Sequence, residues 1–391
     1  MKFSKRMNLF QESIFTKLNE MKLNKIKNGE NVIDFSIGTP NVPPAKHIME
    51  ALSNAVADRK NYVYAIKDQN KLTHAVSKWY KERYQVDINP DTQVCSLHGS
   101  QEGFANLAMT IVDEGDIVLV PDPCYPVFAD GPLLAGATLH YMPLKKENNY
   151  IIQFEDIPKE VAMKAKLMIV SYPNNPTTAM APDCFYTDLI AFAKKHEIIV
   201  LHDNAYSELV FDNKKGKSFL TFEGAMEVGV EFNSLSKTYA LAGARIGFCI
   251  GNEKIITNLK KLKSNFDYGM FLPLQEAAIT AILGDQTCVN ITKLSYEKRR
   301  NVLCEGFSSI GWNIKKPDAT MFVWAPIPNG FHNSEEFAVE LLERSGVLVT
   351  PGSAFGTCGE GYVRIALVQD EKVIDQAVNQ VKKSKILLQN N

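Results

Sequence analysis

The segment SLSKTYALAGARIGF, residues 234–248, is the most informative stretch of this chain. It follows the apolar strand candidate GVEFN and places Lys237 between small hydroxyl residues, with Arg245 eight positions further on. A lysine in a surface loop is normally solvated, and Lys237 taken alone favours that interpretation. A lysine becomes a useful nucleophile only where burial or neighbouring cations lower its pKa. Evidence for a solvated or a reactive Lys237 must therefore come from the rest of the sequence.

Helical patterns and strand-sized apolar runs alternate around this segment. Helical spacing is found in LTHAVSKWYKERY, GSQEGFANLAMTIV and CFYTDLIAFAKKH. The strand candidates are TQVCSL, DIVLVPD, ATLHYMPL, AKLMIVSY, EIIVLHD, GVEFNSLS and ARIGFCIG. Strands that alternate with helices predict a mainly parallel sheet covered on both faces. We therefore predict an α/β fold built on a mainly parallel, seven-stranded sheet.

The two ends of the chain have a different pattern, with helices and only a few strands. A long helical pattern runs from Glu371 to Leu388. A chain of 391 residues favours about two domains. We predict an N-terminal arm and part of a small domain over residues 1–50, a large domain over 51–285, and the rest of the small α+β domain over 286–391.

Composition excludes several classes of protein. With 43 Lys and Arg against 44 Asp and Glu, the net charge of −1 argues against a dedicated nucleic-acid binder. No apolar run approaches the ~18 residues of a membrane span, and the basic N-terminus lacks a signal-peptide pattern. Seven scattered cysteines without a CxxC pair argue against a disulfide framework or a zinc site. We expect a cytoplasmic protein with no metal and no nucleic-acid or membrane partner.

Four polar clusters follow strand candidates, where ligands bind in open α/β sheets: HGSQEG, SYPNNPTT, HDNAYSE and SLSKTY. Together with PDPCYPVF and GYVRIAL, they resemble the motifs of the class I and II aminotransferases, in that family's order, over roughly residues 30–370. These are fold-type I pyridoxal-phosphate enzymes. The resemblance implies a PLP-dependent transferase fold, pyridoxal 5′-phosphate as cofactor, and transfer of an amino group between an L-amino acid and a 2-oxo acid.

The resemblance also gives roles to residues around the cofactor ring. Lys237 would form the Schiff base with the aldehyde and then move the proton at the substrate α-carbon. Asp203 would pair with the ring nitrogen and keep it protonated. Tyr125 would stack on the ring, while Asn175 and Tyr206 would donate to its phenolate oxygen.

The phosphate and the substrate carboxylate need their own receptors. Ser100 and Gln101 open a helix whose free N–H groups and dipole attract an anion. By the resemblance, the phosphate site would be completed by Ser234, Ser236 and Arg245. Arg364 in GYVRIAL would bind the substrate α-carboxylate with both arms of its guanidinium. The other substrate-binding residues implied are Gly38, Asn175 and Asn265.

Family resemblance further implies a homodimer with composite active sites. Tyr64 would reach across the interface to the partner's phosphate, and Tyr62 is its rival for this role. The segment around Phe15 is expected to fold over the pocket.

The sequence gives less specific evidence about the substrate and the type of reaction. The stretch KSNFDYGMFLPLQ has no second arginine for a dicarboxylate, and several stretches resemble the branch containing L,L-diaminopimelate aminotransferases. A PLP-dependent lyase or synthase, such as a C–S β-lyase, is the alternative, because it would share Lys237, Asp203 and Arg364. A PLP-binding regulator would need a fused basic DNA-binding domain, and a nicotinamide dehydrogenase would need an early GxGxxG motif; neither feature is found.

Overall fold

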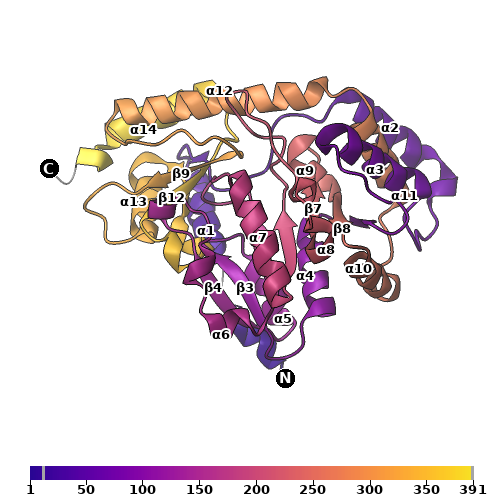
Figure 1. Ribbon diagram of the computed structural model, residues 1–391. Coiled ribbons are helices and arrows are strands. Elements are labelled where there is room, and N and C mark those ends of the chain that lie inside the picture. Colours follow the sequence, from indigo (N-terminus) through magenta and orange to yellow (C-terminus); the bar gives the residue numbers. More distant parts are fainter. Residues whose placement is uncertain (11–13, 389–391) are drawn as a thin grey trace.

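The computed structural model describes residues 1–10 and 14–388 and is built around one large sheet (Figure 1). Its strand order is β2-β8-β7-β6-β5-β3-β4. Only β8 runs antiparallel to its neighbours β2 and β7, and the other neighbouring strands are parallel. The predicted mainly parallel, seven-stranded sheet is therefore confirmed. The strands are β2 (Val94–Leu97), β3 (Ile117–Asp122), β4 (Thr138–Pro143), β5 (Ala165–Ser171), β6 (Ile199–Asp203), β7 (Gly229–Ser234) and β8 (Gly247–Gly251).

Both faces of this sheet are buried. Successive residues of a strand point to opposite faces, and the residues on each face pack in a hydrophobic cluster of their own. Val200 and Phe248 pack in one hydrophobic cluster, whereas their neighbours Leu201 and Cys249 pack in another. The first cluster includes residues of α2 (Lys46–Ala57), α3 (Asn70–Tyr84), α7 (Asp183–His196), α8 (Ala225–Val228) and α11 (Leu272–Leu283). The second includes residues of α4 (Ser100–Ile111), α5 (Val127–Leu134) and α10 (Glu253–Phe266).

Both ends of the chain contribute to a third hydrophobic cluster, which joins Phe35 to Phe337 and Ile365. Strand β1 (Ile33–Asp34) pairs in parallel with β10 (Val347–Leu348). Beside this pair, β9 (Phe322–Pro326), β11 (Thr350–Pro351) and β12 (Tyr362–Ala366) form an antiparallel sheet. The associated helices are α1 (Ile14–Lys27), α12 (Thr287–Ser309), α13 (Ser334–Ser345) and α14 (Glu371–Ser384).

Helix α12 connects the two parts of the molecule, and Figure 1 shows it running from above α2 and α11 to α14. Its Val289 belongs to the cluster under the large sheet, while Leu303 and Phe307 belong to the cluster of the chain ends. The predicted division at residues 50/51 and 285/286 stays a prediction. Its first boundary falls within α2 and its second lies just before α12.

The C-terminal helix α14 is shorter than its sequence pattern predicts, and the remaining α-helices have only four residues each. They include α6 (Lys159–Ala162) and α9 (Leu235–Thr238). Helix α14 ends at Ser384 because Lys385 has a left-handed backbone with φ 55°, and a 3₁₀ turn over Ile386–Leu388 follows. Within the described ranges, no helix is long and apolar enough to cross a membrane.

Candidate active site

A cavity of about 730 Å³ lies where β5, β6 and β7 end, next to β9 and β12 of the smaller sheet. It therefore occupies the position at which open α/β sheets bind ligands. The predicted site residues that line it are Gly38, Ser100, Gln101, Tyr125, Asn175, Asp203, Tyr206, Ser234, Ser236, Lys237, Arg245 and Arg364. Residues separated by more than three hundred positions in the chain meet here.

Lys237 lies in α9, directly after β7, where the short helix turns its side chain into the cavity. Its ammonium donates a hydrogen bond of 2.6 Å to the carbonyl oxygen of Gly38. Burial, followed by the charges of Arg364 and Arg245, lowers the pKa of Lys237 to about 8. The amine is therefore far easier to deprotonate than that of a solvated lysine, as the chemistry of a nucleophilic lysine requires.

Asp203 ends strand β6 and is 8% exposed. Burial raises the pKa of its carboxyl to about 6, while the hydrogen bond from the Ala205 N–H, at 3.2 Å, acts in the opposite direction. At neutral pH the group is still mostly ionised. Such a carboxylate can hold a proton on a nearby ring nitrogen.

The turn between β2 and α4 forms one end of the cavity. Gly99 precedes the helix with φ 82°, a conformation that favours glycine, and a Cβ atom there would overlap the guanidinium of Arg245. The free N–H groups at the start of the twelve-residue helix α4 thus lie beside a cation. Together with Ser234 and Ser236, they make a receptor suited to a phosphate.

Arg364 on β12 is 5% exposed and lies between two aromatic rings. Its guanidinium carbon is 4.1 Å from the centroid of Phe322 and 4.5 Å from that of Phe355. Nη1 donates to Oδ1 of Asn175 at 2.9 Å, and Nη2 donates to the carbonyl of Ser36 at 3.1 Å. Burial lowers the pKa of Arg364 to about 10. Its buried Nε has no hydrogen-bond partner within the described part of the chain, so a donor remains for a carboxylate.

The aromatic side chains frame the rest of the cavity. Tyr125, between β3 and α5, donates its hydroxyl to Oε1 of Gln101 at 3.2 Å. Tyr206 is buried, and its ring meets Phe322 edge to face with centroids 5.8 Å apart. Burial raises the pKa of both phenols, so both hydroxyls stay protonated and can donate.

Tyr64 and Asn265 do not line the cavity of their own chain. Tyr64 is 83% exposed and contacts Tyr268, with ring centroids 5.8 Å apart. Asn265 is exposed on α10 and donates its amide to the Lys261 carbonyl at 2.8 Å. The side chain of Phe15 lies outside the described part of the structure.

Phe322 and Phe355 are the functional residues that sequence reasoning missed. Both rings touch the guanidinium of Arg364, and a Cβ on Gly38 would lie only 2.5 Å from Phe322. Their segments, TMFVWAP and PGSAFG, resemble those of the family, but that resemblance assigned no role to either phenylalanine. A buried apolar residue is normally part of the core, so no local signal marks these two rings.

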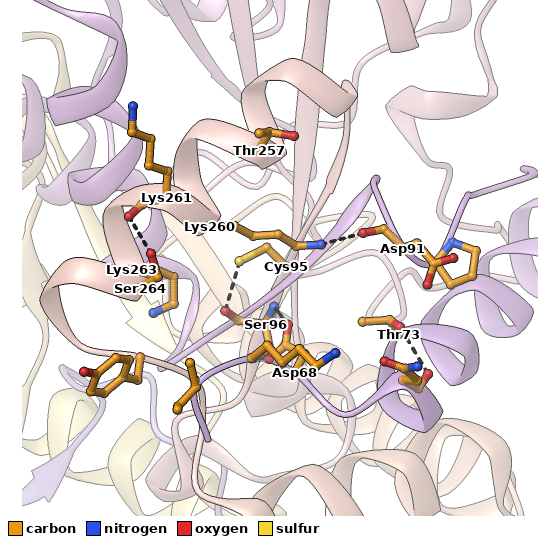
Figure 2. Close-up of a pocket in the computed structure, with 16 residues that line it drawn as sticks. Asp68, Thr73, Asp91, Cys95, Ser96, Thr257, Lys260, Lys261, Lys263 and Ser264 are labelled. Atoms are coloured by element: carbon orange, nitrogen blue, oxygen red, sulfur yellow. Dashed lines mark hydrogen bonds between the residues drawn. The ribbon is translucent and has the colours of Figure 1, made fainter. Parts of the chain in front are cut away.

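A second cavity, of about 610 Å³, lies between α10 and the segments around β2 and α3 (Figure 2). None of the predicted site residues lines it. Its wall includes Lys263, whose ammonium is already bonded to carboxylates, and Asp68, whose carboxylate accepts from the N–H and hydroxyl of Ser96. Lysines also line this second cavity, but none of the predicted site residues does, so the first cavity is the candidate active site.

The first cavity fits pyridoxal 5′-phosphate on its own geometry. It presents an amine with a lowered pKa for an aldehyde, a buried carboxylate for a ring nitrogen, and a helix start beside Arg245 for a phosphate. Arg364 lines the same cavity, and its buried Nε has no hydrogen-bond partner among the described residues, which suits a substrate carboxylate.

Known proteins resemble this chain over nearly its whole length. The family described as aminotransferase class I and II matches residues 30–381. An LL-diaminopimelate aminotransferase of Dehalococcoides mccartyi is 43% identical over 379 residues, which is 97% of each protein. A substrate-bound structure of BacF from Bacillus subtilis has a TM-score of 0.95 at 38% identity and covers 98% of both chains. A probable N-succinyldiaminopimelate aminotransferase from Thermus thermophilus has a TM-score of 0.90 at 31% identity, covering 95% of this chain and 100% of that one.

Proposed function

This chain belongs to the class I and II aminotransferases and is a PLP-dependent aminotransferase, and from that premise we propose how its own residues perform the reaction. When bound, pyridoxal 5′-phosphate supplies an aldehyde that takes up amino groups and a ring that accepts electrons from the substrate α-carbon. The protein must hold the cofactor, orient the amino acid and move one proton.

Lys237 has the central role in this proposal. Its Nζ would first engage the cofactor aldehyde and then take the proton from the substrate α-carbon. Asp203 would hold a proton at the cofactor ring nitrogen, while Asn175 and Tyr206 would donate to the ring oxygen. Tyr125 would stack on the ring. The observation that carries the proposal is the lowered pKa of Lys237, about 8, in a cavity shared with Asp203 and Arg364.

The phosphate would bind at the start of α4, to Ser100, Gln101, Ser234, Ser236 and Arg245. Arg364 would bind the substrate α-carboxylate, with Asn175 and Gly38 beside it. The two aromatic rings in contact with Arg364 support this role, because their attraction for the guanidinium helps to hold it in place. Asn265 would contribute from the neighbouring subunit, since it lies away from its own cavity.

Substitution of Lys237 tests the core of this proposal. The Lys237→Ala variant should lose the visible absorption band that arises from the bond between Lys237 and the cofactor, and all transfer of amino groups to a 2-oxo acid. Arg245 and the start of α4 remain intact in this variant, so it should still bind cofactor, more weakly. A Lys237→Ala variant that keeps both the visible band and turnover would exclude this lysine.

For the substrate, we propose an L-amino acid with a second, distal ammonium group, of which LL-diaminopimelate is the example named by the relatives. Two carboxylates line the cavity, Asp203 and Asp130. Asp130 lies on α5, partly buried, and burial raises the pKa of its carboxyl. A distal ammonium would offset the free-energy cost of burying the ionised Asp130, because it would place an opposite charge beside the carboxylate.

Turnover of an amino-acid panel tests this assignment. Asp130→Asn should raise KM for LL-diaminopimelate by about tenfold, the loss of one charge-assisted hydrogen bond, and leave KM for a monoamino substrate unchanged. Preference for an apolar amino acid, with no effect of Asp130→Asn, would overturn the diamine proposal. Release of ammonia without an oxo acid would identify a lyase instead.

We also propose that the enzyme works as a homodimer in the cytoplasm. The exposed apolar residues Tyr62, Val63, Tyr64, Ile66, Phe266, Tyr268 and Phe271, here called the aromatic face, support self-association. Tyr64 is favoured over Tyr62 for the partner's phosphate, since the Tyr62 hydroxyl already donates to the Val56 carbonyl at 2.9 Å. The seven unpaired cysteines support a reducing compartment.

A further inference from the structure

Lys263, on α10, is a buried cation that the proposed mechanism does not use. The residue is 5% exposed and lies in the wall of the second cavity (Figure 2). Its ammonium donates to Oε1 of Glu102 at 2.6 Å and to the two oxygens of Asp267 at 2.9 and 3.1 Å. A lysine this deeply buried is found only where its charge is paired.

Glu102 connects this lysine to the active site. It lies in the first turn of α4, the helix start proposed to bind the phosphate. Its Oε2 accepts the backbone N–H of His98 at 2.7 Å, and its Oε1 also accepts the side-chain amide of Asn106 at 2.7 Å. The bond to His98 closes the chain around Gly99, whose left-handed backbone sets the direction of the N–H groups that follow.

The charge of Glu102 is a difficulty for a phosphate site. A carboxylate in the first turn normally interacts well with the helix dipole, but here it would share that turn with a dianion. Hydrogen bonds from His98 and Lys263 outweigh burial and lower the pKa of Glu102 to about 2, so the group is ionised at any working pH. Burial lowers the pKa of Lys263, but the bonds to Glu102 and Asp267 outweigh it and the net shift is upward.

We propose that Lys263 is a positioning residue of the cofactor site, which neutralises Glu102 and holds it against His98 so that the turn at Gly99 can accept the phosphate. The inference rests on the proposed function, in which that turn receives the cofactor. It also explains why His98, Glu102 and Asp267, whose ligand atoms lie within 4.8 Å of one another, need no metal ion. The ammonium of Lys263 already bonds to two of the three and serves as their cation.

The test measures cofactor affinity in apoprotein by titration with pyridoxal 5′-phosphate, followed by visible absorption. Lys263→Met keeps the length of the side chain and removes its charge, so the dissociation constant should rise about tenfold. Adding Glu102→Gln in the same chain removes the uncompensated charge and should restore most of the affinity. A purely structural role of Lys263 predicts no such rescue, because the double variant has lost still more hydrogen bonds.

Lys260→Met is the matched control. Lys260 lies one turn earlier on α10 and lines the same cavity, but its ammonium donates to the Asp91 carbonyl at 2.9 Å rather than to a carboxylate. This variant should bind cofactor as the parent protein does. Equal affinity of Lys263→Met and the parent, or a double variant no better than the single one, would overturn the proposal.

Two further variants keep the test decisive. If Lys263→Met does not fold, Glu102→Gln alone should bind cofactor at least as tightly as the parent, and weaker binding would contradict the charge argument. Arg245→Gln distinguishes a failure of this inference from a failure of the proposed phosphate site. Unchanged affinity in Arg245→Gln means that the phosphate site itself is wrong, whereas weakened affinity there with no effect at Lys263 rejects only the role of Lys263.

Discussion

At the residue scale, two buried cations line the same cavity, and the charge of Arg364 makes Lys237 easier to deprotonate. Burial and the charge of Arg364 together lower the pKa of Lys237 to about 8. Because the folded protein favours the neutral amine, this shift costs stability in full below about pH 8, and the cost shrinks as the pH rises from there toward the ordinary lysine pKa of 10.5. The protein thus gives up some stability for a reactive amine.

The pH dependence of cofactor uptake tests this relation. The rate at which apoprotein takes up pyridoxal 5′-phosphate should rise with a midpoint near pH 8 and then level off, since only the neutral amine attacks an aldehyde. Arg364→Gln removes one of the cations that lower the pKa, so its midpoint should lie at higher pH. Stopped-flow absorption gives both values. A midpoint near that of free lysine in the parent protein would refute the shift.

The residues that sequence reasoning could assign are those marked by a local pattern. Lys237, Asp203 and Asn175 each follow a recognisable strand, and all three line one cavity. Phe322 carries no such mark, because its contact with Arg364 arises only when strands β9 and β12 pair. The pairing of Glu102 with Lys263 joins residues 161 positions apart and is likewise invisible before folding.

At the scale of elements, the junction between β2 and α4 is the most constrained turn of the site. Gly99 has φ 82°, and Arg245 fills the space that a side chain at this position would need. An alanine there would carry both a backbone strain of about 1 kcal/mol and a steric overlap. The overlap would displace the guanidinium proposed to bind the phosphate.

Gly99→Ala should therefore weaken cofactor binding by about tenfold or more and lower the melting temperature by a few degrees. Gly115→Ala provides a matched control, since Gly115 has φ 88° but nothing within 4 Å of a new Cβ atom. The control should show a smaller loss of melting temperature, from backbone strain alone, with unchanged cofactor affinity. Equal affinity losses in the two variants would mean that backbone strain alone, and not Arg245, is responsible.

Most elements and the mainly parallel sheet were predictable from the sequence, but the reversal of one strand was not. The apolar run that becomes β8 has the same alternation as its neighbours, yet it is the one strand that runs antiparallel within the described sheet. Direction depends on how the chain crosses between strands, and periodicity carries no information about that. The end of α14 at Ser384 was also missed, because a helical pattern continues through Lys385, whose backbone turns left-handed.

At the scale of the whole molecule, the cavity of a single chain is lined by nearly all of the proposed site residues but not by Tyr64 or Asn265. The Tyr64 side chain is 83% exposed on the aromatic face and lies outside its own cavity. In the proposed homodimer, each site would receive Tyr64 from the other chain. Composition alone could not predict this, since exposed aromatic residues occur singly on many monomers.

Hybrid dimers test the exchange of Tyr64. Tyr64→Ala and Lys237→Ala should each be nearly inactive alone at limiting cofactor. After subunit exchange in equal amounts, half of the dimers pair one chain of each kind, and each hybrid holds one complete site. The mixture should thus regain about a quarter of the parent activity per chain. No recovery, with dimers shown by light scattering, would rule out a shared site, and recovery with Tyr62→Ala instead would favour Tyr62.

The exposed position of Tyr64 also has a consequence for how activity responds to the amount of protein in a cell. Because a complete site in the proposed homodimer needs two chains, most chains are inactive monomers when the protein is scarce. Doubling a low concentration of the chain then more than doubles the rate of amino-group transfer. Once chains are abundant enough to pair, output follows supply in simple proportion. While the protein is scarce, amino-group transfer would therefore rise more steeply than the amount of chain, without any effector molecule.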